Sequence, residues 1–408
     1  MKKEYEEKII KEALKKNRTP FYFYNEKKFI DNYIELEEAF KNIYSNFQIA
    51  YSFKANYMPA ICKKAKELGS YAEVASDMEY SLAKSYGFPP SCIIVNGPGK
   101  WYGLEEMIKD GTTIIVDNEY ELEKIIEHSN NLSIKARIGF RLNFDIGSKK
   151  RSRFGIDANS DTIEQCIEKA RNSNIKICGF HFHLGGSRTI ENWKIRASKM
   201  IYYSKKYLRE NECEFIDLGS GMFGHMHKDF AKQFNCKIAS FEQYAATVAK
   251  QFNNEFKEYN VKPTLIVEPG STIVANTSKY CTKVLAVKKI GSRIIAIVDG
   301  SVQQLGEIGK NKKLPFMILH EKKKINAYNS IDITGYTCLE DDVLIRDYNG
   351  TVAPGDIIVF DNTGAYTNVL KPPFIQSGCK IISLINNELV ITKRDEEAGD
   401  IISSYYGG

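Results

Sequence analysis

Short runs of β-forming residues alternate with longer amphipathic runs from about residue 30 to about residue 280. The run 47–53, FQIAYSF, has the composition of a strand, and the run 58–69, MPAICKKAKELG, has helical spacing and ends in a glycine. The same succession recurs after strand-like runs at 92–96, 113–117, 138–143, 175–183, 215–219 and 264–270. About eight such units predict an α/β fold, a (βα)8 TIM-like barrel over residues 30–280.

After residue 280 the helical spacing ends and β-rich runs take over, as in 293–299, 356–360 and 389–392. We therefore expect a second, C-terminal all-β domain over residues 281–408, joined by the N-terminal segment 1–29. No linker rich in proline, glycine or serine separates the two parts. The two domains are expected to pack together rather than to be tethered.

The charge and cysteine content exclude several classes of protein. The formal charge of +6 arises from 57 basic and 51 acidic residues, which is a small excess without a concentrated basic patch, so nucleic acid is not expected as a partner. Nine scattered cysteines without a Cys-x-x-Cys pair are typical of a reducing cytoplasm. Because no apolar signal core and no apolar run of about 18 residues is present, we predict a cytoplasmic protein without a membrane segment.

In a barrel of this kind the functional side chains lie just after the C-terminal ends of the strands. The residues at those positions form a coherent set of chemically useful groups. They are Lys54, Glu73, Asn96, Arg141, His181, His183, the turn 217–221 and the turn 268–270.

Three of these features have a plain structural interpretation when each is taken alone. Lys54 lies among apolar residues that would desolvate its amine, as a Schiff-base lysine requires, although a lysine at a strand end is more often a surface charge. The glycine-rich run 217–224, DLGSGMFG, suits close approach of backbone N–H groups to a phosphate, but also an ordinary tight turn. Glu268 in the turn Glu-Pro-Gly could hold a pyridine nitrogen protonated, or could form a structural salt bridge.

The histidines raise the question of a metal site. His181 and His183 alternate on one strand and face the same side, and His225 and His227 have the same spacing. Carboxylates or cysteines at ligand spacing are not evident beside either pair. We therefore predict no metal site, and interpret His225 and His227 as loop residues near the mouth of a pocket.

Taken together, the motifs resemble the ornithine, arginine and diaminopimelate decarboxylases, a family with the alanine-racemase-like fold. The resemblance covers nearly the whole chain, and the motifs stand in the family's order. It implies a βα barrel and a β domain that bind pyridoxal 5'-phosphate. The motifs are 51–56 (YSFKAN), 73–79 (EVASDME), 96–100 (NGPGK), 181–185 (HFHLG), 217–221 (DLGSG), 268–270 (EPG), Cys338 and 364–366 (GAY).

The resemblance also implies roles for individual residues. Lys54 would form the internal aldimine, His183 would stack on the cofactor ring, and Glu268 would pair with the pyridinium nitrogen. Arg141 would line the barrel near the ring. The phosphate would be held by backbone amides and one hydroxyl, those of Gly219, Ser220, Gly221, Gly270 and Tyr366. The roles of Asn56, Glu73 and Asn96 remain open.

Cys338 lies in the predicted β domain, far along the chain from Lys54. The resemblance implies that it reaches the active site of the partner subunit and protonates the decarboxylated carbon, which requires a homodimer with shared active sites. Without the resemblance, a lone cysteine would be read as a buried apolar residue, as the other eight are.

The same residues favour decarboxylation of a small-molecule amino acid over the alternatives. A pyridine nitrogen kept protonated by Glu268 makes the ring a strong electron sink. A racemase or epimerase would be expected to carry an arginine there and a tyrosine in place of Cys338. A non-catalytic homologue that only binds the cofactor would not need both Lys54 and Cys338.

The pattern departs from the family at positions that bind substrate. Ser271 stands where diaminopimelate decarboxylases have an arginine, and Leu339 follows Cys338 where an acidic residue would pair with a distal amino group. Glu340, Asp341 or Asp342 could replace that acidic residue. The family's serine after the stacking histidine is displaced by one position, to Ser187. We therefore predict that neither diaminopimelate nor ornithine is the best substrate, and that a larger amino-acid conjugate suits Leu339 better.

Overall fold

The computed structural model describes residues 3–148, 151–321, 326–370 and 373–406. The chain divides into two compact units. The barrel unit contains residues 30–224 and 236–273, and the β unit contains residues 1–29, 225–235 and 274–408.

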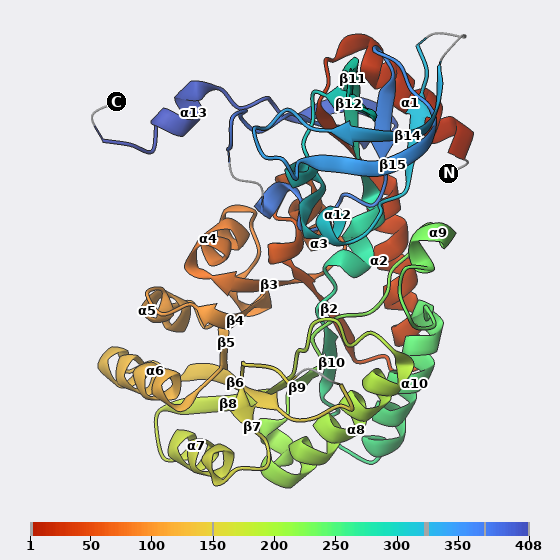
Figure 1. Cartoon of the computed structure of the whole chain (residues 1–408). Helices are drawn as coiled ribbons and strands as arrows, with labels where there is room; N and C mark the ends of the chain where they lie inside the picture. Colours follow the sequence, from red (N-terminus) through yellow and green to blue (C-terminus); the bar gives the residue numbers. More distant parts are fainter. Residues whose placement is uncertain (1–2, 149–150, 322–325, 371–372, 407–408) are drawn as a thin grey trace. The chain divides into compact units, whose positions relative to one another are not determined.

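The barrel unit is built on a closed ring of eight parallel strands (Figure 1). Each barrel strand pairs with the next one along the chain, including β5 with β6. The ring closes because the last strand, β10, pairs with the first, β2. A short strand, β7 (Ile156–Asp157), extends β6. The barrel strands are β2 (Phe47–Ser52), β3 (Tyr71–Ser76), β4 (Ile93–Gly99), β5 (Thr113–Val116), β6 (Ala136–Asn143), β8 (Ile175–His181), β9 (Phe215–Asp217) and β10 (Thr264–Val267).

Amphipathic helices follow the strands and lie on the outer side of the barrel (Figure 1). Four of them begin at a side chain that accepts a hydrogen bond from the N–H three residues on, which satisfies one of the unpaired donors of the first turn. These caps are Ser76, Asn118, Thr189 and Ser240. The helices are α2 (Glu26–Lys41), α3 (Pro59–Glu67), α4 (Asp77–Ser85), α5 (Leu104–Lys109), α6 (Glu119–Leu132), α7 (Asp161–Arg171), α8 (Ile190–Tyr207), α10 (Phe241–Glu255) and α11 (Ser271–Val274).

The inside of the barrel is a packed core rather than a channel. Ala50, Ile94, Ile115 and Ile266 from four different strands pack with Phe215. Gly179 makes room for this residue, because a Cβ at that position would lie 2.1 Å from the backbone oxygen of Phe215. The core closes the barrel below the strand ends, so the polar side chains there lie above an apolar floor.

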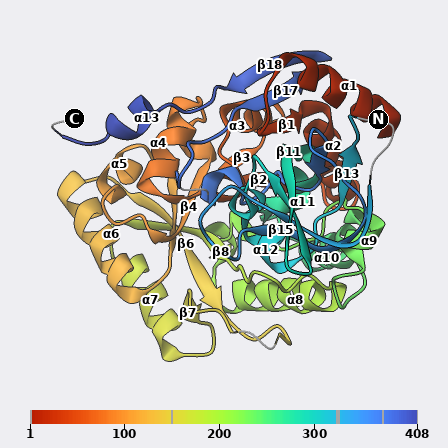
Figure 2. The same cartoon turned by 45° about the horizontal axis from the view of Figure 1, so that its top comes forward.

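The β unit is a largely antiparallel sheet with the order β15-β14-β12-β11-β1-β17-β18, and β16 pairs with both β11 and β13. The N-terminal strand β1 pairs antiparallel with β11 and parallel with β17 (Figure 2). Its strands are β1 (Phe21–Asn25), β11 (Ser278–Ile290), β12 (Arg293–Val298), β13 (Phe316–Leu319), β14 (Ala327–Thr334), β15 (Val343–Thr351), β16 (Ile357–Phe360), β17 (Ile381–Ile385) and β18 (Glu388–Lys393). Its helices are α1 (Lys3–Lys16), α9 (Lys228–Ala231), α12 (Gly306–Asn311) and α13 (Ala398–Ile402).

The predicted architecture, a TIM-like barrel with a separate all-β part, is confirmed. The division along the chain differs from the predicted ranges, because residues 225–235 and 274–280 belong to the β unit. Gln233 explains the first difference, since its side chain exchanges two hydrogen bonds with the backbone of Lys313. The second follows from β11, which begins at Ser278 and pairs with β1. In the described ranges, every helix is too short or too polar to cross a membrane.

Candidate active site

Lys54 lies in a short 3-10 turn (Phe53–Ala55) directly after β2, between two fully buried neighbours. Its amine pairs with the carboxylate of Glu73, which is buried within β3 and also accepts a hydrogen bond from Ser52. About a third of the Lys54 side chain stays exposed (33%). The amine is therefore held by a buried anion, on a side chain that stays partly exposed.

Asn56 shapes the turn that carries this lysine. Its side-chain oxygen accepts a hydrogen bond from the N–H of Met58 at 3.0 Å, and its backbone oxygen accepts one from Tyr51 at 2.8 Å. These contacts give Asn56 a structural role among the residues whose roles the sequence left open.

Glu268 lies after β10 in a buried cluster of polar side chains. The amide of Asn96 donates to one carboxylate oxygen at 2.8 Å, and Nε2 of His181 lies 3.3 Å from the other. Asp217, the last residue of β9, completes the cluster, since one ligand-type atom each from His181, Asp217 and Glu268 lies within 4.8 Å of the others. All four side chains are buried.

Burial decides which members of this cluster carry charge. It lowers the pKa of His181, so the imidazole is neutral. Burial, with the adjacent Glu268, raises the pKa of Asp217 well above its usual range. Burial opposes ionisation of Glu268 as well, but the hydrogen bond from His181 and the charge of Lys54 outweigh it and lower the pKa. Glu268 is therefore the anion of the cluster, and Asp217 holds a proton.

Two buried atoms of the cluster, Nδ1 of His181 and Oδ2 of Asp217, have no hydrogen-bond partner among the residues that the structure describes. The proton on Asp217 accounts for the second, because a protonated carboxyl oriented toward Glu268 needs no other donor. From the sequence, the metal ligand expected beside His181 would be His183, two residues on along the same strand. The structure instead brings His181 together with two carboxylates from other strands, in a cluster with the composition of a metal site.

His183 and the glycine-rich turn after β9 pack closely together. The N–H of Ser220 donates to Nδ1 of His183 at 3.2 Å. Gly219 and Gly221 have positive φ angles of 59° and 107°, in the region that favours glycine. A Cβ on Gly219 would lie 2.8 Å from Cβ of His183, so glycine is required for this approach.

Two of the amides expected to hold phosphate are engaged within the protein. The N–H of Gly219 donates to Asp217 at 2.7 Å, and that of Ser220 donates to His183. For the N–H of Gly221 no acceptor is found among the described residues. Gly270 is buried, and its carbonyl accepts from Ile273 at 3.1 Å.

Arg141 joins this group from the end of β6. It is buried, donates to the backbone oxygen of His183 at 3.2 Å, and lies with its guanidinium 4.7 Å from the centre of the Phe154 ring. Burial lowers its pKa, and the nearby carboxylates of Asp117 and Glu268 act against that shift. A guanidinium stays charged in this setting.

Arg196 is a functional candidate that the sequence analysis did not name. It is fully buried in α8, and its guanidinium donates to the carbonyls of Leu218 and Ser220 at 3.0 and 2.9 Å. The only signal in the sequence is a lone arginine on the apolar side of a helix, between Trp193 and Ala197.

The side chain of Ser187, the displaced serine, donates to Ser148 at 3.1 Å.

Cys338 and Tyr366 belong to the β unit. Cys338 and Leu339 are exposed on the loop between β14 and β15. Asp342 is buried and holds this loop by accepting hydrogen bonds from the N–H and the hydroxyl of Thr337, so it is not an available substrate contact, whereas Glu340 and Asp341 are exposed.

Tyr366 is half-buried and has a positive φ of 55°. Such an angle is uncommon for a residue with a bulky side chain, and therefore marks a backbone that its surroundings hold in place.

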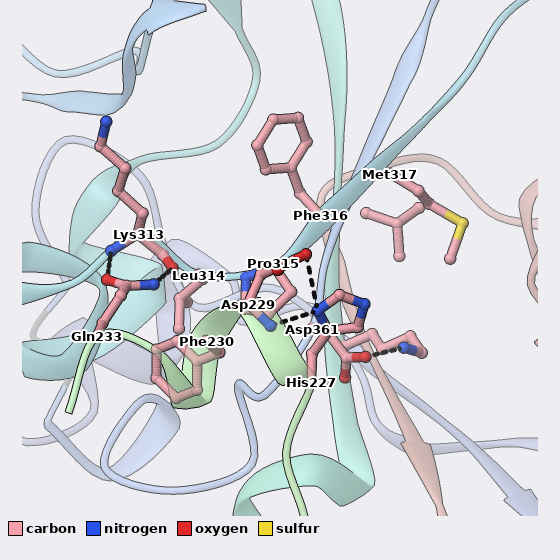
Figure 3. A pocket seen from close by; sticks show the side chains of 12 residues that line it. His227, Asp229, Phe230, Gln233, Lys313, Leu314, Pro315, Phe316, Met317 and Asp361 are labelled. Atoms are coloured by element: carbon pink, nitrogen blue, oxygen red, sulfur yellow. Dashed lines mark hydrogen bonds and ion pairs between the residues drawn. The ribbon is translucent and has the colours of Figure 1, made fainter. Parts of the chain in front are cut away.

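The β unit contains a hollow of about 490 Å³, lined in part by residues of α9 and β13 (Figure 3). His227 lies at its edge and caps α9 by accepting a hydrogen bond from the N–H of Asp229 at 3.3 Å. The charged Lys279 on the wall is paired with Asp361 at 2.8 Å. His227 thus has a structural role in the β unit, and His225 lies exposed in the same segment.

Comparison with known proteins gives consistent matches. Residues 30–275 match the sequence model of the family described as "Pyridoxal-dependent decarboxylase, pyridoxal binding domain". The chain is 28% identical to the diaminopimelate decarboxylase of Aquifex aeolicus, over 96% of this chain and 93% of that protein. It is 27% identical to that of Methanocaldococcus jannaschii, over 96% and 92%.

Solved structures share the fold. A diaminopimelate decarboxylase from M. jannaschii in complex with L-lysine superposes with a TM-score of 0.85 at 24% identity, covering 96% of this chain and 93% of that one. A lysine/ornithine decarboxylase complexed with putrescine from Vibrio vulnificus gives a TM-score of 0.75 at 19% identity, covering 93% and 98%.

Proposed function

Because this chain belongs to the pyridoxal-dependent decarboxylases, and so is an amino-acid carboxy-lyase that uses pyridoxal phosphate, we propose that Lys54, His183 and Glu268 form its cofactor site. The observation that carries this proposal is the convergence of the three side chains at the C-terminal ends of barrel strands β2, β8 and β10, with Lys54 paired to a buried carboxylate.

The residues at the strand ends fit the cofactor. A ring can lie against His183, whose burial lowers the pKa and keeps the imidazole neutral. Glu268 offers a buried anionic acceptor, which suits a protonated ring nitrogen. Gly219 approaches His183 so closely that a Cβ at position 219 would fill the space beside the imidazole. Lys54 would hold the cofactor covalently, and Gly219, Ser220, Gly221, Gly270 and Tyr366 would surround the phosphate.

When bound, the cofactor would supply a ring that accepts the electron pair left when carbon dioxide departs. The Glu268 carboxylate, which Asn96 and His181 orient, would hold a proton at the ring nitrogen. Glu73 stabilises the ammonium form of Lys54 whenever the amine is released. Arg141 balances the negative charge of the surrounding carboxylates.

We propose that the protein is a homodimer, and that the Cys338 thiol donates a proton to the substrate carbon that has lost carbon dioxide in the active site of the partner subunit. The exposure of its thiol on a loop held by Asp342 supports this role, because a donor for another subunit must be accessible and ordered. The substrate is an amino acid or amino-acid conjugate other than diaminopimelate or ornithine, since Leu339 and Ser271 offer no charge to a distal ammonium or carboxylate.

The test is the visible absorption spectrum of the purified protein before and after borohydride, beside Lys54→Ala and the exposed-lysine control Lys63→Ala. We expect an absorption band at roughly 420 nm in the wild type and the control, which borohydride abolishes. Borohydride should leave the cofactor covalently attached to these two proteins but not to Lys54→Ala. Release of carbon dioxide from a panel of L- and D-amino acids then identifies the substrate. No band after addition of pyridoxal phosphate would refute the site, and rapid turnover of diaminopimelate or ornithine would refute the substrate proposal.

A further inference from the structure

Arg196 has an unusual environment for an arginine. Its side chain is fully buried, and its hydrogen bonds go to backbone carbonyls, those of Leu218 and Ser220 and, at 3.4 Å, that of Ser187. The guanidinium also lies over the ring of Trp193, 4.3 Å from its centre. Across the described ranges, no carboxylate forms an ion pair with it.

A buried charge without an ion-pair partner is costly. Removing an ion from water typically costs several kcal/mol, and proteins usually recover this with an opposite charge nearby. Burial lowers the pKa of Arg196, but a guanidinium does not lose its proton under ordinary conditions. Carbonyl dipoles recover part of the cost, so the site retains a positive charge that an external anion would compensate.

The hydrogen bonds of Arg196 also set the direction of the turn. In a planar trans peptide, the C=O and N–H groups point in opposite directions. Because the carbonyls of Leu218 and Ser220 point at Arg196, the N–H groups of Gly219 and Gly221 point away from it. The first donates to Asp217, and the second has no acceptor among the residues described.

We propose that Arg196 is a positioning residue for the phosphate of the cofactor, which it orients and attracts from behind the turn 218–221 without touching it. The Gly221 N–H is the direct donor, and the guanidinium fixes its direction and supplies the balancing charge. This inference rests on the proposed cofactor site, and it makes phosphate recognition depend on a residue of α8 rather than on the turn alone.

The test separates the phosphate from the ring by comparing two probes. The full-length protein is stripped of cofactor, and the dissociation constants of pyridoxal 5'-phosphate and of pyridoxal are measured for the wild type, Arg196→Met and Arg196→Lys. Arg171→Met serves as the control, because it removes an exposed arginine at the end of α7 that also donates to a backbone carbonyl, that of Tyr207, and is paired with Glu212.

We expect Arg196→Met to raise the dissociation constant of pyridoxal 5'-phosphate by about tenfold or more, while that of pyridoxal changes by less than about twofold. Arg196→Lys should fall between, because it keeps the charge but loses the fork that reaches two carbonyls. If binding of both probes weakens equally, the ratio of the two dissociation constants is unchanged; Arg196 then has a merely structural role and the proposal is overturned. If Arg196→Met does not fold, the same ratio measured for Arg196→Lys decides.

A second measurement keeps this inference distinct from the proposed cofactor site. Inorganic phosphate should raise the melting temperature of the cofactor-free wild type and of Arg171→Met, but not that of Arg196→Met. If the wild type binds neither pyridoxal compound, the cofactor site is refuted, while stabilisation by phosphate that depends on Arg196 still supports an anion site at the turn. Equal stabilisation of all variants overturns the role of Arg196.

Discussion

At the strand ends of the barrel unit, a cluster of polar side chains is buried and its members hold one another, as Glu268 does with Asn96 and His181. In the loop between β14 and β15 of the β unit, the arrangement is reversed. Cys338 and Leu339 are exposed, and the buried side chain, Asp342, holds only the backbone and neighbouring hydroxyls. A buried polar network fixes charge and direction, whereas an exposed loop on a rigid anchor lets side chains change without loss of the fold.

The comparison predicts that a substitution in the buried network causes the largest loss of activity. Glu268→Gln keeps the size of the side chain but removes the anion that holds a proton on the ring nitrogen, so we expect kcat to fall by roughly 10²–10³-fold. Steady-state decarboxylation measures this, with Glu214→Gln as the control, a carboxylate paired with Arg137 away from the cluster. Activity of Glu268→Gln within about threefold of the wild type would contradict the assignment.

Cys338→Ala should lower kcat by about 10²-fold, because general-acid catalysis contributes on that order. Mixing the weakly active Cys338→Ala with Lys54→Ala should restore up to about a quarter of wild-type activity, since half of randomly formed dimers are hybrids and each hybrid has one intact site of its two. Cys236→Ala, another exposed cysteine, is the control. If mixing restores nothing although the subunits exchange, the proton donor does not come from a partner.

Asp217 gives a smaller effect, on stability. Its raised pKa means that it stabilises the fold fully below the unfolded pKa of about 4, and that this contribution is lost as the pH rises through the folded pKa. Asp217→Asn mimics the protonated form, so its melting temperature should fall less with rising pH than that of the wild type. We expect a difference of roughly 2–4 °C at the alkaline end.

Infrared spectroscopy gives a direct check on the same residue. The difference spectrum of the wild type and Asp217→Asn at neutral pH should contain the carbonyl stretch of a protonated carboxyl group, and a difference spectrum removes the bands of other carboxyls with raised pKa values, such as Glu79. Identical spectra and parallel melting curves would mean that Asp217 is ionised and that the cluster is organised differently.

The smallest predicted effect lies on the exposed loop. Leu339→Asp adds a carboxylate next to Cys338 and should raise kcat/KM for amino acids with a distal amino group by about fivefold, without a change in melting temperature. Relative rates on lysine, ornithine and an uncharged amino acid measure this shift, and the control is Leu285→Asp, which adds a carboxylate at another exposed leucine of the β unit. An unchanged preference would place Leu339 outside the substrate pocket.

The sequence by itself determined the architecture and the residues at the strand ends. The barrel was predictable because strand and helix periods are local, and because parallel strands bring their C-terminal ends to one edge. Lys54, His183, the turn 217–221 and Glu268 followed from that rule and from motifs in the order of a known family.

Only the tertiary structure decided which of these side chains interact. The contact of Asp217 with Glu268 and His181 joins three strands far apart in the sequence, and its charge state depends on burial that no spacing reveals. Arg196 looked like an ordinary helix residue until its carbonyl partners were known. Local periodicity is a property of neighbouring residues, whereas hydrogen bonding and desolvation are set by groups that only folding brings together.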